Sequence, residues 1–195
     1  IGPVSVAAFS MSTMFIAVPT GVKIVNWMGT MWGGKIRFTT PMLFASGVVA
    51  MFTIGGLSGV THAVAPSDTQ QTDTYYIIAH FHYVIFGGII LGLFSGFYFW
   101  WPKVFGFKLS EKQGKMGFWT MLIGFNLAFG PMHMSGLLGQ PRRTAVLPDE
   151  LGENVLLYNR LSTVGTFIII LSVSLFLWNV VKTKRSVQEN VPIDP

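Results

Sequence analysis

The chain has 195 residues, of which 51% are hydrophobic and 11% are charged, whereas soluble domains carry about 25% charged residues. This composition excludes an ordinary soluble domain and predicts a membrane protein, and the absence of cysteine excludes disulfides and thiolate metal sites. The formal net charge of +5 does not indicate a nucleic-acid partner, because the basic residues lie in short segments between apolar runs, as orientation signals do.

Five apolar segments are each long enough, at about 20 residues, to cross a bilayer as a helix. Glycine recurs in the second, third and fourth of them, which we interpret as close packing of membrane helices. The segments predict an all-α membrane protein with five transmembrane helices, at residues 3–22, 41–60, 75–101, 116–138 and 161–181.

The basic residues predict the orientation of these spans. Segments 23–37, 103–115 and 182–185 together carry ten of the thirteen Lys and Arg residues. Because positively charged loops stay on the inner side, we predict that these three segments are cytoplasmic. The tail 186–195 is then a short cytoplasmic extension.

The third span contains His80-Phe81-His82 within a run that has no Lys, Arg, Asp or Glu. An ionisable side chain inside a membrane is costly and usually functional. Residues i and i+2 of a helix point about 200° apart, so the two imidazole rings leave opposite faces. Since neutral imidazole binds iron, copper and zinc, the tripeptide predicts one helix that holds two metals. We interpret His62 and His133, near outer helix ends, as satisfied structural or interfacial histidines.

Arg142 and Arg143 are adjacent cations on the outer, otherwise acidic side. The planar guanidinium fork suits carboxylates and phosphates. Two interpretations stay open: the pair holds the propionates of a heme bound to the third span, or it meets a lipid headgroup or forms a salt bridge with Asp149 or Glu150.

Lys23 follows Pro19-Thr20-Gly21 at the inner end of the first span. It is either an ordinary interfacial lysine or a protonatable group at the mouth of a proton path. Hydroxyl side chains of the same span would be polar steps on that path, although such groups also bond their own helix carbonyls. They are Ser10, Ser12, Thr13 and Thr20.

Three motifs resemble subunit I of the heme–copper oxygen reductases. DTYYIIAHFHYV at 73–84 is similar to helix X of that family, AVPTGVK at 17–23 to the end of helix VIII in the A-type, cytochrome c oxidase-like branch, and GQPRR at 139–143 to the loop before helix XII. The motifs occur in family order with similar spacing. The resemblance therefore covers essentially the whole chain, as helices VIII to XII of a twelve-helix bundle.

The resemblance implies a role for each matching residue. His80 resembles the proximal ligand of the high-spin heme, and His82 resembles an axial ligand of the low-spin heme. Phe81 would lie between the two hemes. Arg142 and Arg143 resemble the pair that holds heme propionates and tunes the reduction potential.

Further roles follow from the same resemblance. Asp68 matches an acid near the propionates of the high-spin heme, and Tyr75 matches a tyrosine near the low-spin heme. Lys23 and Thr20 match the entry segment of the K-pathway for protons.

One departure concerns the magnesium site of the family, which uses a His-Asp pair. Here the pair is Thr72-Asp73, and the missing imidazole puts the magnesium site at Asp73 in doubt.

The function implied is that of a terminal respiratory oxidase with two hemes, of A-type, that reduces oxygen to water with electrons from cytochrome c and pumps protons. In the family, the copper ligands and the second low-spin heme ligand lie upstream of the residue matching Ile1. We therefore expect a fragment, a processed piece or one part of a split subunit. Its partners would be the remainder of subunit I, subunits II and III, the electron donor and the lipid bilayer.

Other functions stay open. They are a quinol oxidase of the same superfamily, a non-catalytic heme-binding electron-transfer module, and a transporter without metal. The expected location is a bacterial or archaeal plasma membrane, with the mitochondrial inner membrane as the alternative.

Overall fold

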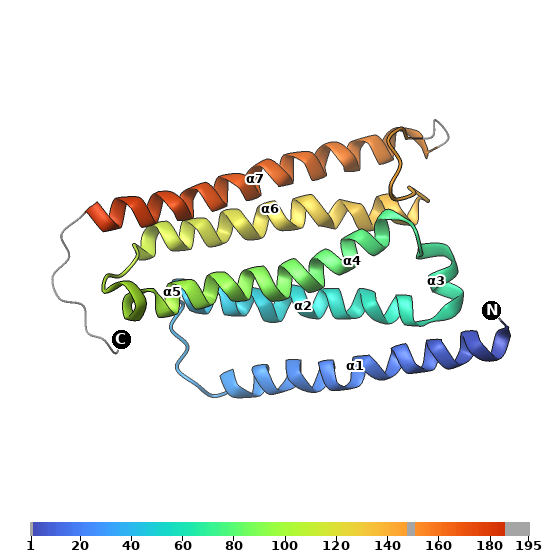
Figure 1. Ribbon diagram of the computed structural model, residues 1–195, viewed down its shortest axis with the longest axis horizontal. Coiled ribbons are helices and arrows are strands. Elements are labelled where there is room, and N and C mark those ends of the chain that lie inside the picture. The colour runs from blue at the N-terminus through green and yellow to red at the C-terminus, as the bar shows by residue number, and fades with distance from the viewer. Residues whose placement is uncertain (1, 148–150, 186–195) are drawn as a thin grey trace.

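The computed structural model describes residues 2–147 and 151–185. Every element in this part of the chain is a helix, so the predicted all-α class is confirmed (Figure 1). The elements are α1 (Pro3–Met31), α2 (Thr40–Ala63), α3 (Ala65–Gln71), α4 (Tyr75–Ile85), the π-helical turn η1 (Phe86–Ile90), α5 (Leu91–Phe105), α6 (Glu111–Leu137) and α7 (Gly152–Arg185).

The long helices lie side by side, and α4, η1 and α5 run on as one continuous helical segment (Figure 1). This segment packs against α2 on one side and α6 on the other, and α7 packs on α6. Helix α1 lies at the edge of the bundle against α2 and buries none of its residues. The ligand candidates on α4 are therefore enclosed by α2 and α6.

The helices extend beyond most of the predicted spans. Helix α1 continues to Met31, so Lys23 lies within a helix and not in a loop. Helix α7 begins at Gly152, nine residues before the predicted span at 161. The predicted tail 186–195 lies outside the described residues.

Within the described residues, four helical segments are long and apolar enough to cross a membrane, namely α1, α2, α4 with η1 and α5, and α7. Helix α6 has 27 residues, but polar positions such as Asn126 and His133 lower its hydropathy. Its crossing of the membrane therefore stays a prediction.

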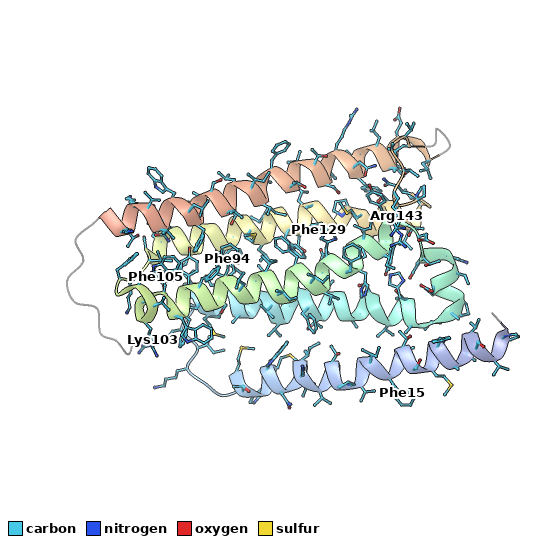
Figure 2. The ribbon with its side chains drawn as sticks, viewed as in Figure 1. Phe15, Phe94, Lys103, Phe105, Phe129 and Arg143 are labelled. Atoms are coloured by element: carbon cyan, nitrogen blue, oxygen red, sulfur yellow. The ribbon has the colours of Figure 1, made fainter. Side chains whose placement is uncertain are left out.

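The connections fall at the two ends of the bundle (Figure 1). The α1–α2 and α5–α6 connections lie at the same end as the end of α7, which brings the three basic segments together. Arg143 lies at the opposite end, whereas Lys103 and Phe105 lie at the basic end (Figure 2). This arrangement agrees with the predicted clustering of positive charge on one side.

Aromatic side chains and glycines fill the space between the helices. Phe44, Phe118 and Phe125 are almost fully buried in one core shared by α2, α5 and α6. A Cβ atom on Gly55 would lie 2.9 Å from the backbone of Tyr83, so α2 and α4 are in backbone contact there. The interpretation of the glycines as packing residues is confirmed at this crossing.

Candidate functional site

His80 is held by helix α2 through one ring nitrogen. Its Nδ1 lies 3.0 Å from the carbonyl oxygen of Gly55 and 2.9 Å from the hydroxyl of Ser58. A carbonyl can only accept, so Nδ1 carries the hydrogen and Nε2 keeps the lone pair that a metal binds. A Cβ atom on Gly59 would lie 2.8 Å from His80 Cε1, so a glycine is required beside the ring.

A cavity of about 300 Å³ opens beside His80, between α1, α2 and α4. Apart from His80, only Thr13 and Thr20 bring polar side chains to its wall. An apolar cavity with one available imidazole suits a flat apolar ring that carries a metal. The remaining lining residues are Ile16, Ala17, Phe52, Gly56, Gly59, Val60, Ala63 and Val84.

His82 contacts a different helix. Its ring stacks on Phe129 of α6, with the centroids 4.1 Å apart and the planes at 13°. Its Nδ1 donates to the carbonyl of Ile78, at 2.7 Å, one turn back on α4, which leaves Nε2 for a metal. The prediction that the two rings leave opposite faces agrees with these contacts, and Phe81 lies beside the His82 ring at 4.5 Å.

Residues 2–147 and 151–185 hold no group of three or more His, Cys, Asp or Glu side chains that could bind one metal ion. Each of the two histidines would therefore supply a single protein ligand from this part of the chain.

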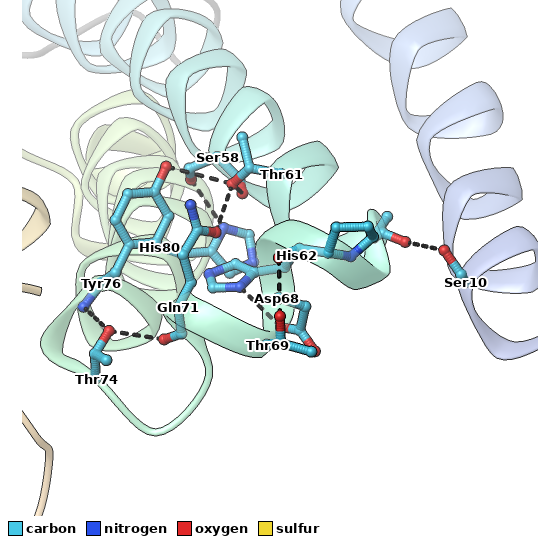
Figure 3. A network of polar contacts seen from close by, with 12 residues as sticks. Ser10, Ser58, Thr61, His62, Asp68, Thr69, Gln71, Thr74, Tyr76 and His80 are labelled. Atoms are coloured by element: carbon cyan, nitrogen blue, oxygen red, sulfur yellow. Dashed lines mark hydrogen bonds and ion pairs between the residues drawn. The ribbon is translucent and has the colours of Figure 1, made fainter. Parts of the chain in front are cut away.

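A polar network covers the end of α4 near His80 (Figure 3). The Thr61 hydroxyl lies 3.1 Å from Gln71 Oε1 and 3.3 Å from the Tyr76 hydroxyl, which joins α2, α3 and α4. His62 Nδ1 lies 3.3 Å from Asp68 Oδ1, so Asp68 faces an imidazole. Asp68 itself is 43% exposed at its side chain.

The interpretation of His62 as a satisfied histidine is wrong for one of its nitrogens. Nε2 is buried and has no hydrogen-bond partner within the described part of the chain. The reason is that α3 supplies one acceptor, Asp68, which reaches only the Nδ1 side. His133, in contrast, packs edge-on against the rings of Tyr76 and Tyr83.

The two loops at this end of the bundle are joined by Asp73 and Arg142. Arg142 Nε donates to the Asp73 carboxylate at 2.8 Å, and the backbone N–H of Arg142 donates to the Asp73 carbonyl at 2.9 Å. Tyr75 N–H donates to the Gln140 carbonyl at 2.9 Å. Arg142 thus pairs with an acid from the other loop, and the carboxylate expected at a magnesium site is engaged by an arginine.

Both Asp73 and Arg143 adopt left-handed backbone conformations, with φ of 60° and 63°. Arg143 is exposed, and no ion pair joins it to another described residue. Asp149 and Glu150, the alternative partners of the arginines, lie outside the described residues. The Arg143 side chain is therefore open to solvent at this end of the bundle.

Lys23 and Thr20 have different environments. Lys23 is exposed on α1, whereas Thr20 lies one turn earlier and lines the cavity beside His80. The Thr20 hydroxyl bonds the Ile16 carbonyl of its own helix at 3.1 Å. The geometry brings Thr20 to the cavity, and a proton path through Lys23 stays a prediction.

Sequence reasoning did not connect His80 with the face of α2 that contacts it. Gly55, Ser58, Gly59 and His62 are spaced i, i+3, i+4 and i+7, so they share one helix face. That spacing is a readable signal, but glycine alone indicates packing equally well. Phe129, the stacking partner of His82, carries no signal of its own in a phenylalanine-rich chain.

Residues 1–168 match the family model described as "Cytochrome C and Quinol oxidase polypeptide I". Among curated proteins, the chain is 47% identical over 194 residues to "Cytochrome c oxidase subunit 1" of Alkalihalophilus pseudofirmus, a match that covers 100% of this chain and 31% of the relative. It is 50% identical over 173 residues to the protein of the same name from Thermostichus vulcanus, covering 89% of this chain and 31% of the relative.

A similar solved structure is described as a heme-copper terminal oxidase dimer, with a TM-score of 0.76 at 17% identity, covering 98% of this chain and 39% of the other. This likeness supports the fold. The chain spans 31% of the length of the curated relatives above. The matched family model, together with the apolar helices, shows that the chain is an integral membrane protein and belongs to the cytochrome c and quinol oxidase polypeptide I family of heme–copper oxidases.

Proposed function

We propose that this chain supplies one axial ligand to each of two hemes in subunit I of a terminal respiratory oxidase. The oxidase reduces oxygen to water with electrons from cytochrome c and couples this reaction to proton pumping. The observation that carries the proposal is the pair His80 and His82, whose rings contact opposite neighbours, α2 and α6, while each keeps Nε2 for iron.

The residues around the pair fit the cofactor. His80 borders the apolar cavity, and Gly59 leaves room for its ring. Bound heme supplies a redox-active iron, and the chain's own side chains hold it, orient it and exclude water from it. The carbonyl of Gly55 fixes the rotation of His80, as a partner of a metal-bound histidine usually does.

Other residues take supporting roles in this proposal. Arg143 has exposed donors for a propionate, and Arg142 would share its guanidinium between Asp73 and the other propionate. Phe81 lies between the two histidines and would separate the hemes. Tyr75 would border the low-spin heme, and the copper ligands would come from residues outside this chain.

Proton delivery would use the face of α1 that lines the cavity. Thr20 and Thr13 border the cavity beside His80, and Lys23 lies one turn beyond Thr20. A cation at that place can pass protons toward the cavity when water bridges the hydroxyl groups. The three basic segments at one end of the bundle favour a cytoplasmic C-terminus, in a bacterial or archaeal plasma membrane.

The test is a reduced-minus-oxidised spectrum of the complete oxidase complex that contains this chain, recorded with and without carbon monoxide. We expect two heme populations, one of which binds carbon monoxide. His82→Ala should remove the low-spin signal, and His80→Ala should remove the carbon monoxide signal. His133→Ala is the matched control and should retain both hemes.

Two results would contradict the proposal: a complex without heme, or a His82 variant with an unchanged low-spin spectrum. A complex with two low-spin hemes and no carbon monoxide binding would indicate an electron-transfer module. Turnover with reduced cytochrome c and with a quinol distinguishes the two donors, and the names of the relatives favour cytochrome c.

A further inference from the structure

His62 has a buried ring nitrogen without a partner, which is unusual for a polar group in a folded protein. The side chain is 11% exposed, and Nε2 makes no hydrogen bond within the described part of the chain. A buried polar atom of this kind costs free energy unless a ligand, ion or water completes its bonding. The position therefore indicates a missing partner at Nε2.

The other contacts of His62 fix where that partner would lie. Asp68 takes Nδ1 at 3.3 Å and so orients the ring. The centroid of the His62 ring lies 5.1 Å from that of the His80 ring, and Figure 3 shows His62 joined to Asp68 and His80 joined to Ser58. Ala63, the next residue, lines the cavity that His80 borders. The His62 ring therefore lies next to the His80 ring, and the residue that follows it borders the cavity.

The chemistry of that partner follows from the donor set. Nδ1 faces the Asp68 carboxylate, which can only accept, so a second carboxylate is a suitable acceptor for a hydrogen bond from Nε2. Asp68 is the first carboxylate. A heme bound at His80 would bring carboxylates of its own, because a porphyrin carries two propionates.

We propose that His62 is a positioning residue that donates a hydrogen bond from Nε2 to a propionate of the heme held by His80. This inference rests on the proposed function, because it requires a heme at His80. Removal of the donor leaves the propionate charge less compensated, which favours the ferric iron and lowers the midpoint potential of that heme.

The experiment uses the complete oxidase complex and a redox titration of the heme that binds carbon monoxide, without turnover. His62→Leu and His62→Asn should lower the equilibrium constant for reduction of this heme about three- to tenfold. A tenfold change corresponds to about 59 mV for a one-electron couple. His62→Gln should shift the potential less than His62→Asn, because the longer amide reaches the position of Nε2 and donates a hydrogen bond there. His133→Leu is the control and should keep the wild-type value.

Equal shifts in the Gln and Asn variants, or no shift in any His62 variant, would overturn the inference. If the Leu variant does not assemble, the contrast between Asn and Gln decides. The low-spin heme should keep its potential in every His62 variant, and a shift there instead would equally overturn the inference. A wild-type complex without a carbon monoxide-binding heme would contradict the proposed function, and so is distinguishable from a failure of His62 alone.

Discussion

Gly136 on α6 is the position where a single methyl group should disturb the candidate site most. A Cβ atom there would lie 2.1 Å from the backbone nitrogen of Tyr76 and 2.7 Å from its Cα, whereas ordinary contacts are 3.4–4 Å. The obstructing atoms are backbone, so α6 and the start of α4 must separate by about an ångström. Overpacking of this kind costs about 1–3 kcal/mol.

Gly117→Ala is the matched control for Gly136→Ala. Gly117 is also buried on α6, but a Cβ atom there meets no atom within 4 Å. Both variants gain the helix preference of alanine over glycine, about 0.8–1.0 kcal/mol. The difference between them is therefore the overpacking cost alone.

Heating the detergent-solubilised oxidase complex while following heme absorbance measures this difference as a rate of loss. Gly136→Ala should lose heme faster than the wild type, and Gly117→Ala should not. The heme that we propose at His80 should be affected first, since Tyr76 lies one turn before His80 on α4. Equal heat resistance in the two variants would refute the backbone contact between α4 and α6.

Three other substitutions test the contacts around this site. Tyr83→Phe removes the donor that lies 2.8 Å from the side-chain oxygen of the half-buried Asn126, and should cost about 0.5–1.5 kcal/mol and so speed heme loss in the same heating assay. Asp73→Asn should cost less than about 1 kcal/mol of stability, because the ion pair with Arg142 is exposed. Asp73→Ala should cost more stability than Asp73→Asn, because alanine disfavours the left-handed backbone conformation of this position. Asn179→Leu removes the bonds that tie α7 to the α5–α6 connection, and should raise protease cleavage there.

The length of the apolar segments was sufficient to locate each long helical segment in the described part of the chain. The opposite placement of His80 and His82 also followed from local geometry, because a rotation of 200° depends on nothing outside α4. Helix ends were less predictable. The positive charge of Lys23 suggested that the first span ends there, yet the helix continues to Met31. Lysine has a high helix propensity, so its charge marks the membrane boundary and not the end of the helix.

The pairing of Asp73 with Arg142 could not be predicted, because it depends on how two loops 69 residues apart meet. Considered alone, Asp73 was interpreted as a metal ligand and Arg142 as a partner of a heme propionate. The partners of His62 were hidden for the same reason, since Asp68 reaches it only through the short helix α3. Local patterns identify which side chains carry chemistry, whereas tertiary packing decides which of their donors stay available.

The neighbour helix α2, more than α4 itself, determines how His80 is presented. Its contribution is mainly backbone: the carbonyl of Gly55 accepts from Nδ1, and the missing side chain of Gly59 leaves room for the ring. Ser58 adds a second contact to the same nitrogen. A backbone carbonyl stays in place when its own residue is substituted, as long as the helix is preserved. The orientation of His80 therefore depends on how closely α2 and α4 approach, more than on any one side chain. The glycines that allow this approach thus shape the candidate site as well as the packing.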